Sequence, residues 1–153
     1  MNRYLLLTAL LLCVFGNAVV AEEISHGFLA CGQKTYIMGA EGKPSWTYPA
    51  STRDGYVLND GTIILTLSKS KGHGGSVVSI APDGEQTLIW KGTQSEVNSA
   101  HPTADGTFVI TEAGNSPRLL EVSASGEVML EFPLACQKMN HHMQTRMARK
   151  LSD

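Results

Sequence analysis

Arginine and amide side chains recur at one fixed distance before three aspartates of this 153-residue chain. Asp60-Gly61 and Asp105-Gly106 are turn-forming pairs, and the third aspartate is Asp153. Counting back seven residues from these aspartates gives Arg53, Asn98 and Arg146. Arginine binds carboxylate, sulfate or phosphate through paired N–H donors. Arg53 and Arg146 are therefore candidates for binding an anionic group from two sides of a channel; the favoured alternative is that water and neighbouring carbonyl groups satisfy both.

Two histidines lie at positions where they can join such a site. His101 is four residues before Asp105 and can act as a general base or a ligand, although the following Pro102 indicates a strand end and an exposed imidazole. His142 belongs to an adjacent histidine pair, whose members would face opposite ways in a strand. One of the pair can reach the channel mouth near Arg146. No Cys/His spacing fits zinc, so we predict no metal site.

Small residues stand five positions before the same aspartates, namely Gly55, Ala100 and Ala148. Small side chains suit the innermost strand of a radial repeat, where the repeats crowd around an axis. The arginine and asparagine positions lie two residues earlier, so a regular strand would place them on the same face. We therefore expect three inner strands that line one water-filled channel.

A 42-residue repeat positions these strands. Its turn glycines are Gly42, Gly84 and Gly126. The large apolar residues that follow at four and six positions are Trp46, Tyr48, Leu88, Trp90, Leu130 and Phe132. Segments rich in β-branched and apolar residues flank the turns, at 62–67, 77–80, 87–90, 107–111, 119–122 and 128–132. Four strands in just over 40 residues predict an all-β fold of β-propeller blades, each with four antiparallel strands.

The repeat defines the expected blades. We predict a partial blade at 28–49, full blades at 51–92 and 95–134, and the first strand of another blade at 144–153. Residues 139–151 favour helix by propensity, whereas their phase in the repeat favours a strand. The sequence stops inside a repeat, so we expect a fragment with open blade edges that are prone to self-association. The alternative is a short chain that completes a ring by oligomerising.

The ends and composition predict the compartment. Residues 1–21 have the charge, apolar run and small residues of a signal peptide cleaved after Ala21, which implies a secreted or periplasmic protein. An uncleaved membrane anchor is the alternative. Cys31 and Cys136 occupy different phases of the repeat, which favours packed thiols over a disulfide. A formal net charge of -2 without a basic stripe argues against nucleic acid and, after cleavage, against a membrane surface.

The segment Gly39-Ala40-Glu41-Gly42-Lys43-Pro44-Ser45-Trp46 resembles the Gly-Lys-x-x-Trp element of quinoprotein-type (PQQ-like) β-propellers. The repeat rhythm is also similar to arylsulfotransferase-type propellers. The resemblance implies that Trp46, and Trp90 and Phe132 in the later repeats, dock on a neighbouring blade. No residue set matches the quinone- and calcium-binding residues of the quinoprotein dehydrogenases, so the sequence does not support PQQ as a cofactor.

Two functions fit these patterns. The first is a secreted or periplasmic propeller that acts as a ligand-binding or scaffold module. The second is a fragment of an extracytoplasmic PQQ-like or arylsulfotransferase-like enzyme that acts on an anionic or carbohydrate-derived substrate. The sequence shows no complete catalytic constellation, which favours the first, while the matching phase of the two arginines supports the second.

Overall fold

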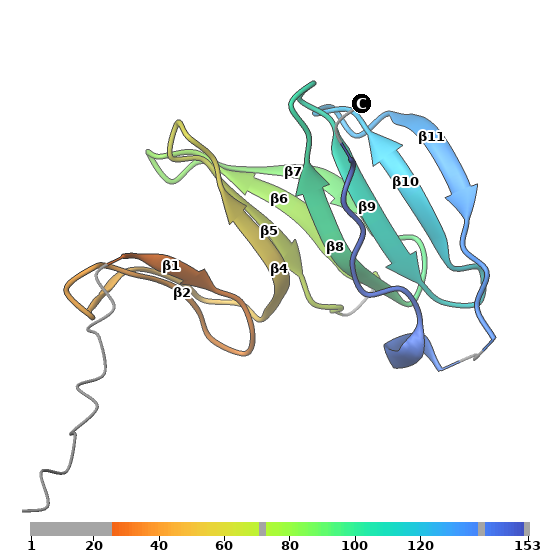
Figure 1. Ribbon diagram of the computed structural model, residues 1–153, viewed down its shortest axis with the longest axis horizontal. Coiled ribbons are helices and arrows are strands. Elements are labelled where there is room, and N and C mark those ends of the chain that lie inside the picture. Colours follow the sequence, from red (N-terminus) through yellow and green to blue (C-terminus); the bar gives the residue numbers. More distant parts are fainter. Residues whose placement is uncertain (1–25, 71–72, 138–139, 152–153) are drawn as a thin grey trace, which may run out of the picture.

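The computed structural model describes residues 26–70, 73–137 and 140–151 as an all-β protein. Eleven strands in this part of the chain form three antiparallel sheets that follow one another in space as they do in sequence (Figure 1). None of the three sheets closes on itself. The predicted signal peptide lies outside the described residues. No helix in the described part is long and apolar enough to cross a membrane.

Each sheet is built from strands that are consecutive in the chain. The first sheet contains β1 (Phe28–Ala30), β2 (Thr35–Met38) and β3 (Pro44–Tyr48), in that order. The second contains β4 (Thr52–Val57), β5 (Ile63–Leu67), β6 (Ser76–Ile80) and β7 (Gln86–Lys91). The third contains β8 (Glu96–Pro102), β9 (Phe108–Ala113), β10 (Arg118–Val122) and β11 (Val128–Pro133). The second and third sheets therefore have the predicted four strands each.

The three repeat glycines occupy equivalent turns, as predicted. Gly42, Gly84 and Gly126 have φ values of 69°, 91° and 81°, a region that glycine adopts without a steric penalty. In each turn the glycine N–H donates to the carbonyl three residues earlier, at 2.8–3.0 Å. Each turn joins the last two strands of its sheet, β2–β3, β6–β7 and β10–β11. The 42-residue spacing is therefore a structural repeat.

Two apolar clusters hold the sheets together. Ile63, Leu65, Val78 and Ile80 of the second sheet pack against Trp46 and other partly buried side chains of the first. Residues of the second and third sheets form a second cluster, against which Trp90 packs. Trp46 and Trp90 thus contact the sheet that follows their own. Phe132 is 60% exposed, because no further sheet of the described chain covers β11.

The last described segment differs from the prediction. Residues 141–143 form a short 3₁₀ helix, η1 (His141–Met143), and 144–151 run alongside the third sheet without strand pairing (Figure 1). Neither the predicted strand nor an α-helix is formed there. A strand needs a partner for its backbone groups, and no described strand pairs with 144–151.

No disulfide joins Cys31 and Cys136.

Candidate functional site

Arg53 and Asn98 sit at equivalent β-bulges and touch each other. The register shifts between Thr52 and Asp54 where β4 pairs with β5, and between Val97 and Ser99 where β8 pairs with β9. A bulge leaves one residue unpaired and re-aims its side chain. Arg53 Nη1 donates to Asn98 Oδ1 at 3.2 Å, so two of the three phase-matched residues meet between the sheets.

Because of the bulge, Arg53 and Gly55 face opposite sides of the second sheet. A regular strand would have placed both residues on the same face. A Cβ on Gly55 would lie 2.9 Å from Cys31 Sγ and from a methyl carbon of Leu29, toward the first sheet. Arg53 instead reaches toward the third sheet. The strands therefore use the glycine for close packing, as expected, but on the opposite side from the arginine.

Glu96 is the centre of what we call the ion cluster: Arg53, Glu96, Asn98 and His142. Its side chain is 1% exposed, and its Oε1 lies 2.9 Å from Arg53 Nη2 and 3.5 Å from His142 Nδ1. Asn98 Nδ2 donates to the carbonyl oxygen of Thr145 at 3.0 Å. The structure thus brings together three predicted site residues around one buried carboxylate.

Arg146 does not join this cluster. It is exposed, although Thr145 beside it contacts Asn98. Arg53 is already compensated by Glu96. The described chain therefore does not hold the two arginines as a preformed clamp.

His101 lies toward the other end of β8, in what we call the aromatic cluster: Asp54, Tyr56, His101 and Arg149. The Tyr56 and His101 rings meet edge to face, with centroids 5.5 Å apart. Arg149 Cζ lies 5.1 Å from the centroid of the Tyr56 ring, and its Nη2 lies 3.6 Å from Asp54 Oδ2. The inner strands β4 and β8 and the segment 144–151 all contribute to this group.

Burial shifts the pKa values of three side chains in the aromatic cluster. It raises the pKa of Asp54, against the opposing effect of Arg149. It lowers the pKa of His101, and Arg149 lowers that pKa further. Burial and the nearby Asp54 raise the pKa of Tyr56. At neutral pH the His101 imidazole is therefore neutral and the Tyr56 hydroxyl is protonated.

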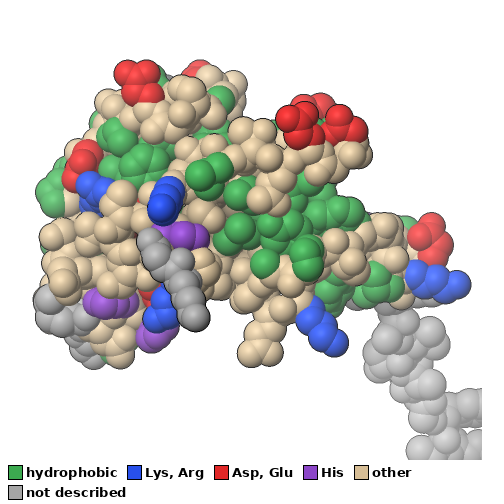
Figure 2. All heavy atoms as spheres, turned by 180° about the vertical axis from the view of Figure 1, so that it is seen from behind, with side chains coloured by type: hydrophobic (Ala, Val, Ile, Leu, Met, Phe, Trp, Pro, Cys, Tyr) green, Lys and Arg blue, Asp and Glu red, His purple; other side chains and the backbone are tan. Residues whose placement is uncertain are grey.

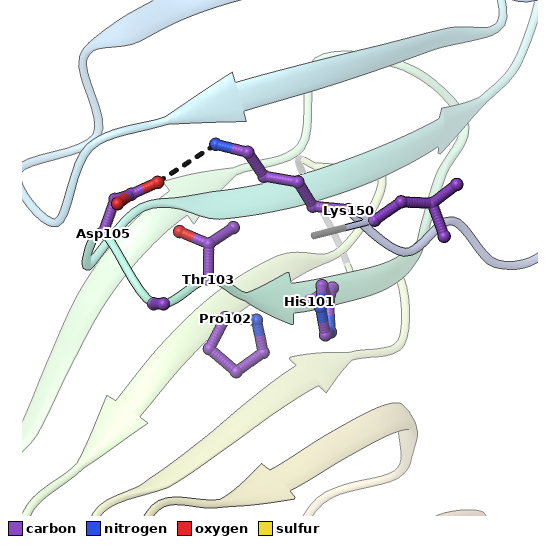
Figure 3. Close-up of a pocket in the computed structure, with 7 residues that line it drawn as sticks. His101, Pro102, Thr103, Asp105 and Lys150 are labelled. Atoms are coloured by element: carbon purple, nitrogen blue, oxygen red, sulfur yellow. Dashed lines mark hydrogen bonds and ion pairs between the residues drawn. The ribbon is translucent and has the colours of Figure 1, made fainter. Parts of the chain in front are cut away.

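A hollow of about 360 Å³ opens beside His101 (Figure 3). Residues 101–105 line it together with Lys150 and Leu151. Lys150 Nζ lies 3.2 Å from Asp105 Oδ2 and 3.2 Å from Glu121 Oε1, so two carboxylates hold its ammonium group. This volume is at the lower end for small-molecule sites.

Buried polar atoms without a hydrogen-bond partner gather on the inner strands. Among the described residues, six such side-chain atoms occur: Arg53 Nε, Asp54 Oδ2, Tyr56 Oη, Thr66 Oγ1, Glu96 Oε2 and His101 Nδ1. Five of them are on β4 or β8, and Thr66 pairs directly with Asp54. Buried polar groups are normally satisfied by protein, water or a ligand. Among the described residues these atoms have no hydrogen-bond partner, so a polar group that reached them would satisfy them.

The described residues contain no group of three His, Cys, Asp or Glu side chains placed to hold a metal ion. Chemistry at this surface would rest on the imidazole of His101, the phenol of Tyr56 and the carboxylates of Asp54 and Glu96.

Sequence reasoning missed four residues of these clusters: Asp54, Tyr56, Glu96 and Arg149. Asp54 and Arg149 are next to predicted residues in the sequence. Side chains alternate between the two faces of a strand, so this alternation did not place either residue on the predicted channel face. Glu96 lies nine residues before Asp105. The residues nine before Asp60 and Asp153 are Ser51 and Gln144, so no acidic residue recurs at this position of the repeat. Tyr56 and Arg149 did share one signal with His101, because each of the three lies four residues before one of the aspartates.

No protein-family model and no curated protein matches this sequence. Among solved structures, the chain is similar to the crystal structure of a protein of unknown function from Bacteroides caccae, with a TM-score of 0.63 and 22% sequence identity. The match covers 77% of this chain and 44% of that one, so this chain spans less than half the length of that protein. The likeness concerns the fold alone.

Proposed function

We propose that the sheets are successive blades of a β-propeller and that the chain is a ligand-binding module acting at its inner strands. Three observations support the blade arrangement. The turns repeat, each sheet packs on the next through its last strand, and β4 and β8 lie side by side through Arg53 and Asn98. In a propeller the first strand of each blade lines the central channel, where ligands bind.

The observation that carries the binding proposal is the concentration of unpartnered buried polar atoms on β4 and β8. An unpartnered buried donor or acceptor costs about 1–3 kcal/mol. A ligand that pairs with several of these atoms recovers part of that cost.

The charges favour a neutral ligand over an anion. Glu96 pairs with Arg53, Asp54 with Arg149, and two carboxylates with Lys150. A free anion would have to displace a carboxylate from one of these cations. A sugar carries several hydroxyl groups that both donate and accept, so its hydroxyls match the mixed requirements of Asp54 Oδ2, Tyr56 Oη and His101 Nδ1. We therefore propose a carbohydrate as the ligand class, in preference to the anionic group expected from Arg53 and Arg146.

Ligand titration followed by amide NMR tests this proposal. The probes are neutral mono- and disaccharides, with glucuronate and sulfate as anionic comparisons. Shifts confined to β4, β8 and 144–151 with a neutral sugar support it, and Tyr56→Phe should weaken that binding about three- to tenfold through one lost hydrogen bond. Tyr36→Phe, in the first sheet, is the matched control. Binding of sulfate alone, or of no probe, contradicts the proposed ligand class.

An extracytoplasmic enzyme is the second candidate, and His101 is the observation that favours it. A general base must be neutral at working pH, and the lowered pKa of His101 meets that condition. Its Nδ1 has no partner. In a sulfuryl-transfer reaction His101 would take the proton of a phenol acceptor, whose oxygen would bond to the sulfur of p-nitrophenyl sulfate as nitrophenolate leaves. Phenol-dependent release of nitrophenolate that is lost in His101→Gln would support a sulfuryl-transfer enzyme; equal release by both chains would reject His101 as its base.

We also propose a secreted or periplasmic location on the strength of residues 1–21. Mass spectrometry of the exported chain should find a mature protein that begins at Glu22.

A further inference from the structure

The second sheet has a longer connection between two of its strands than the other sheets have. Residues 68–75 join β5 to β6, whereas 31–34 and 114–117 make the equivalent connections in the first and third sheets. The structure describes 68–70 and 73–75 of this connection. Insertions in one unit of a repeat lie in loops, and such loops often carry binding or catalytic residues. This connection is therefore a place where a function confined to one sheet can lie.

Within this connection, the side chains of Ser70 and His73 contact each other. Ser70 Oγ lies 2.9 Å from His73 Nε2. Ser70 is exposed and His73 is half-buried. The two residues also form an isolated antiparallel β-bridge, with backbone N–O distances of 3.3 and 3.4 Å. The backbone thus holds the hydroxyl and the imidazole together without depending on either side chain.

The other ring nitrogen of His73 faces the backbone of Gly75. His73 Nδ1 lies 2.8 Å from the Gly75 carbonyl oxygen and 3.2 Å from the Gly75 amide nitrogen. A carbonyl oxygen can only accept, so the shorter contact places the ring proton on Nδ1, whereas the longer one would need the opposite tautomer. Nε2 is then an acceptor, and the Ser70 hydroxyl donates to it. A serine, a histidine that accepts its proton and a group that orients the histidine together make an activated nucleophile.

The orienting carbonyl group is held in place by the chain that leads into the third sheet. Gly92 N donates to the Gly75 carbonyl oxygen at 2.8 Å. Val97 N donates to the carbonyl oxygen of the preceding Gly74, also at 2.8 Å. Both Gly74 and Gly75 are buried. The imidazole of His73 is therefore oriented by backbone that a neighbouring part of the structure fixes.

The serine and the histidine border a hollow of about 320 Å³. Hydrophobic side chains form a broad area over the middle of the rear face (Figure 2), but Ala50 and Leu67 are the only ones among the described residues that line this hollow. A short acyl group fits such a space, whereas a long chain would need a larger apolar surface. Lys69 also lines the hollow and supplies a positive charge for an oxygen that becomes negative during attack.

We propose that Ser70 and His73 form a catalytic pair that hydrolyses short-chain carboxylic esters. Ser70 Oγ bonds to the ester carbonyl carbon while its proton passes to His73 Nε2. His73 gives this proton to the alcohol oxygen as the ester C–O bond breaks, which leaves an acyl-serine. Water then attacks the acyl carbon, its proton passes through His73 to Ser70 Oγ, and the carboxylic acid leaves. The net reaction consumes one ester and one water and yields one acid and one alcohol.

A fluorophosphonate probe tests the nucleophile in the full-length chain. Peptide mapping should find the phosphonyl group on Ser70, and His73→Gln should slow this labelling about 100-fold or more although the serine is still present. Ser125→Ala is the matched control and should leave the rate unchanged. Ser125 is also exposed, and its Oγ lies 2.9 Å from another side chain, but that partner is the Ser123 hydroxyl rather than an imidazole. No label on Ser70, or an equal rate in His73→Gln, overturns the proposal.

Hydrolysis of p-nitrophenyl acetate measures the complete reaction. Ser70→Ala should lower the release of nitrophenolate about 100-fold or more, and it should keep the thermal midpoint of the natural chain because Ser70 is exposed. Equal release by Ser70→Ala overturns the proposal. The ¹⁵N chemical shifts of the neutral His73 ring should also place its proton on Nδ1. A proton on Nε2 would overturn the assignment of His73 as the base.

This activity goes beyond the proposed sugar binding and does not rest on it. A chain that hydrolyses the ester but shows no sugar-induced shifts on β4 and β8 would keep the catalytic pair and reject the ligand site. A chain that binds a neutral sugar but leaves Ser70 unlabelled would keep the ligand site and reject the catalytic pair.

Discussion

At the residue scale, buried carboxylates connect neighbouring sheets. Glu96 of the third sheet pairs with Arg53 of the second, and Glu112 of the third accepts a hydrogen bond from Trp90 of the second. Both carboxylates are 1% exposed. Charged groups at such depth must be paired, so each fixes the position of one sheet against the next.

Glu112 should contribute strongly to stability. Its oxygens accept from Trp90 Nε1 at 2.9 Å, from the Thr93 amide at 2.8 Å and from Arg118 Nε at 2.9 Å. Glu112→Ala leaves these donors unpaired and should cost about 3 kcal/mol in urea unfolding. Glu131→Ala is the control, since Glu131 binds the same arginine but its side chain is 52% exposed; it should cost about 1 kcal/mol or less. Equal losses would contradict this account of the network.

Asp54 should make stability depend on pH in the acid range. Burial raises its pKa above the ordinary 3.8, so the folded chain holds this proton more tightly than the unfolded chain. The resulting stabilisation is present below 3.8 and is lost as pH rises through the folded-state pKa. Asp54→Asn should therefore be more stable than the natural chain at pH 7, by an amount that shrinks toward about pH 3.5 in urea unfolding. A gain that grows as pH falls would have the wrong sign.

At the element scale, turns were predictable from sequence and bulges were not. Glycine adopts positive φ without a steric penalty and other residues rarely do, so Gly42, Gly84 and Gly126 mark their turns in the sequence itself. The bulges at Arg53 and Asn98 depend on how two strands pair, which no single strand's pattern reveals. Both residues were nevertheless predicted as site residues, because both bulges lie seven residues before the aspartate of a turn. The pairing of Arg53 with Glu96 required the structure.

The equivalent turn glycines should differ in their tolerance of a side chain. A Cβ at Gly84 meets nothing within 4 Å, so Gly84→Ala should cost only the left-handed backbone strain, about 1–2 kcal/mol. At Gly126 the added Cβ would lie 2.5 Å from the carbonyl oxygen of Ile89 on β7. Gly126→Ala should therefore lower the thermal midpoint more than Gly84→Ala, as measured by circular dichroism. The reverse order would show that the third turn does not lie against the second sheet.

At the scale of the whole molecule, the sequence repeat predicted the number of strands per sheet and their order. It could do so because each unit is local, with strands joined by short turns. The repeat did not predict which cations would be free to bind a ligand. That depends on contacts between units, such as Lys150 with Asp105 and Glu121. These contacts are the reason for proposing a neutral sugar rather than an anion as the ligand.

The inner strands β4 and β8 of neighbouring sheets meet through the buried pair Arg53–Glu96. A double-mutant cycle on Arg53→Met and Glu96→Gln, read by urea unfolding, measures this contact. We expect a coupling of about 1–3 kcal/mol between the two substitutions. Effects that add to within about 0.5 kcal/mol would mean that the two strands do not meet there.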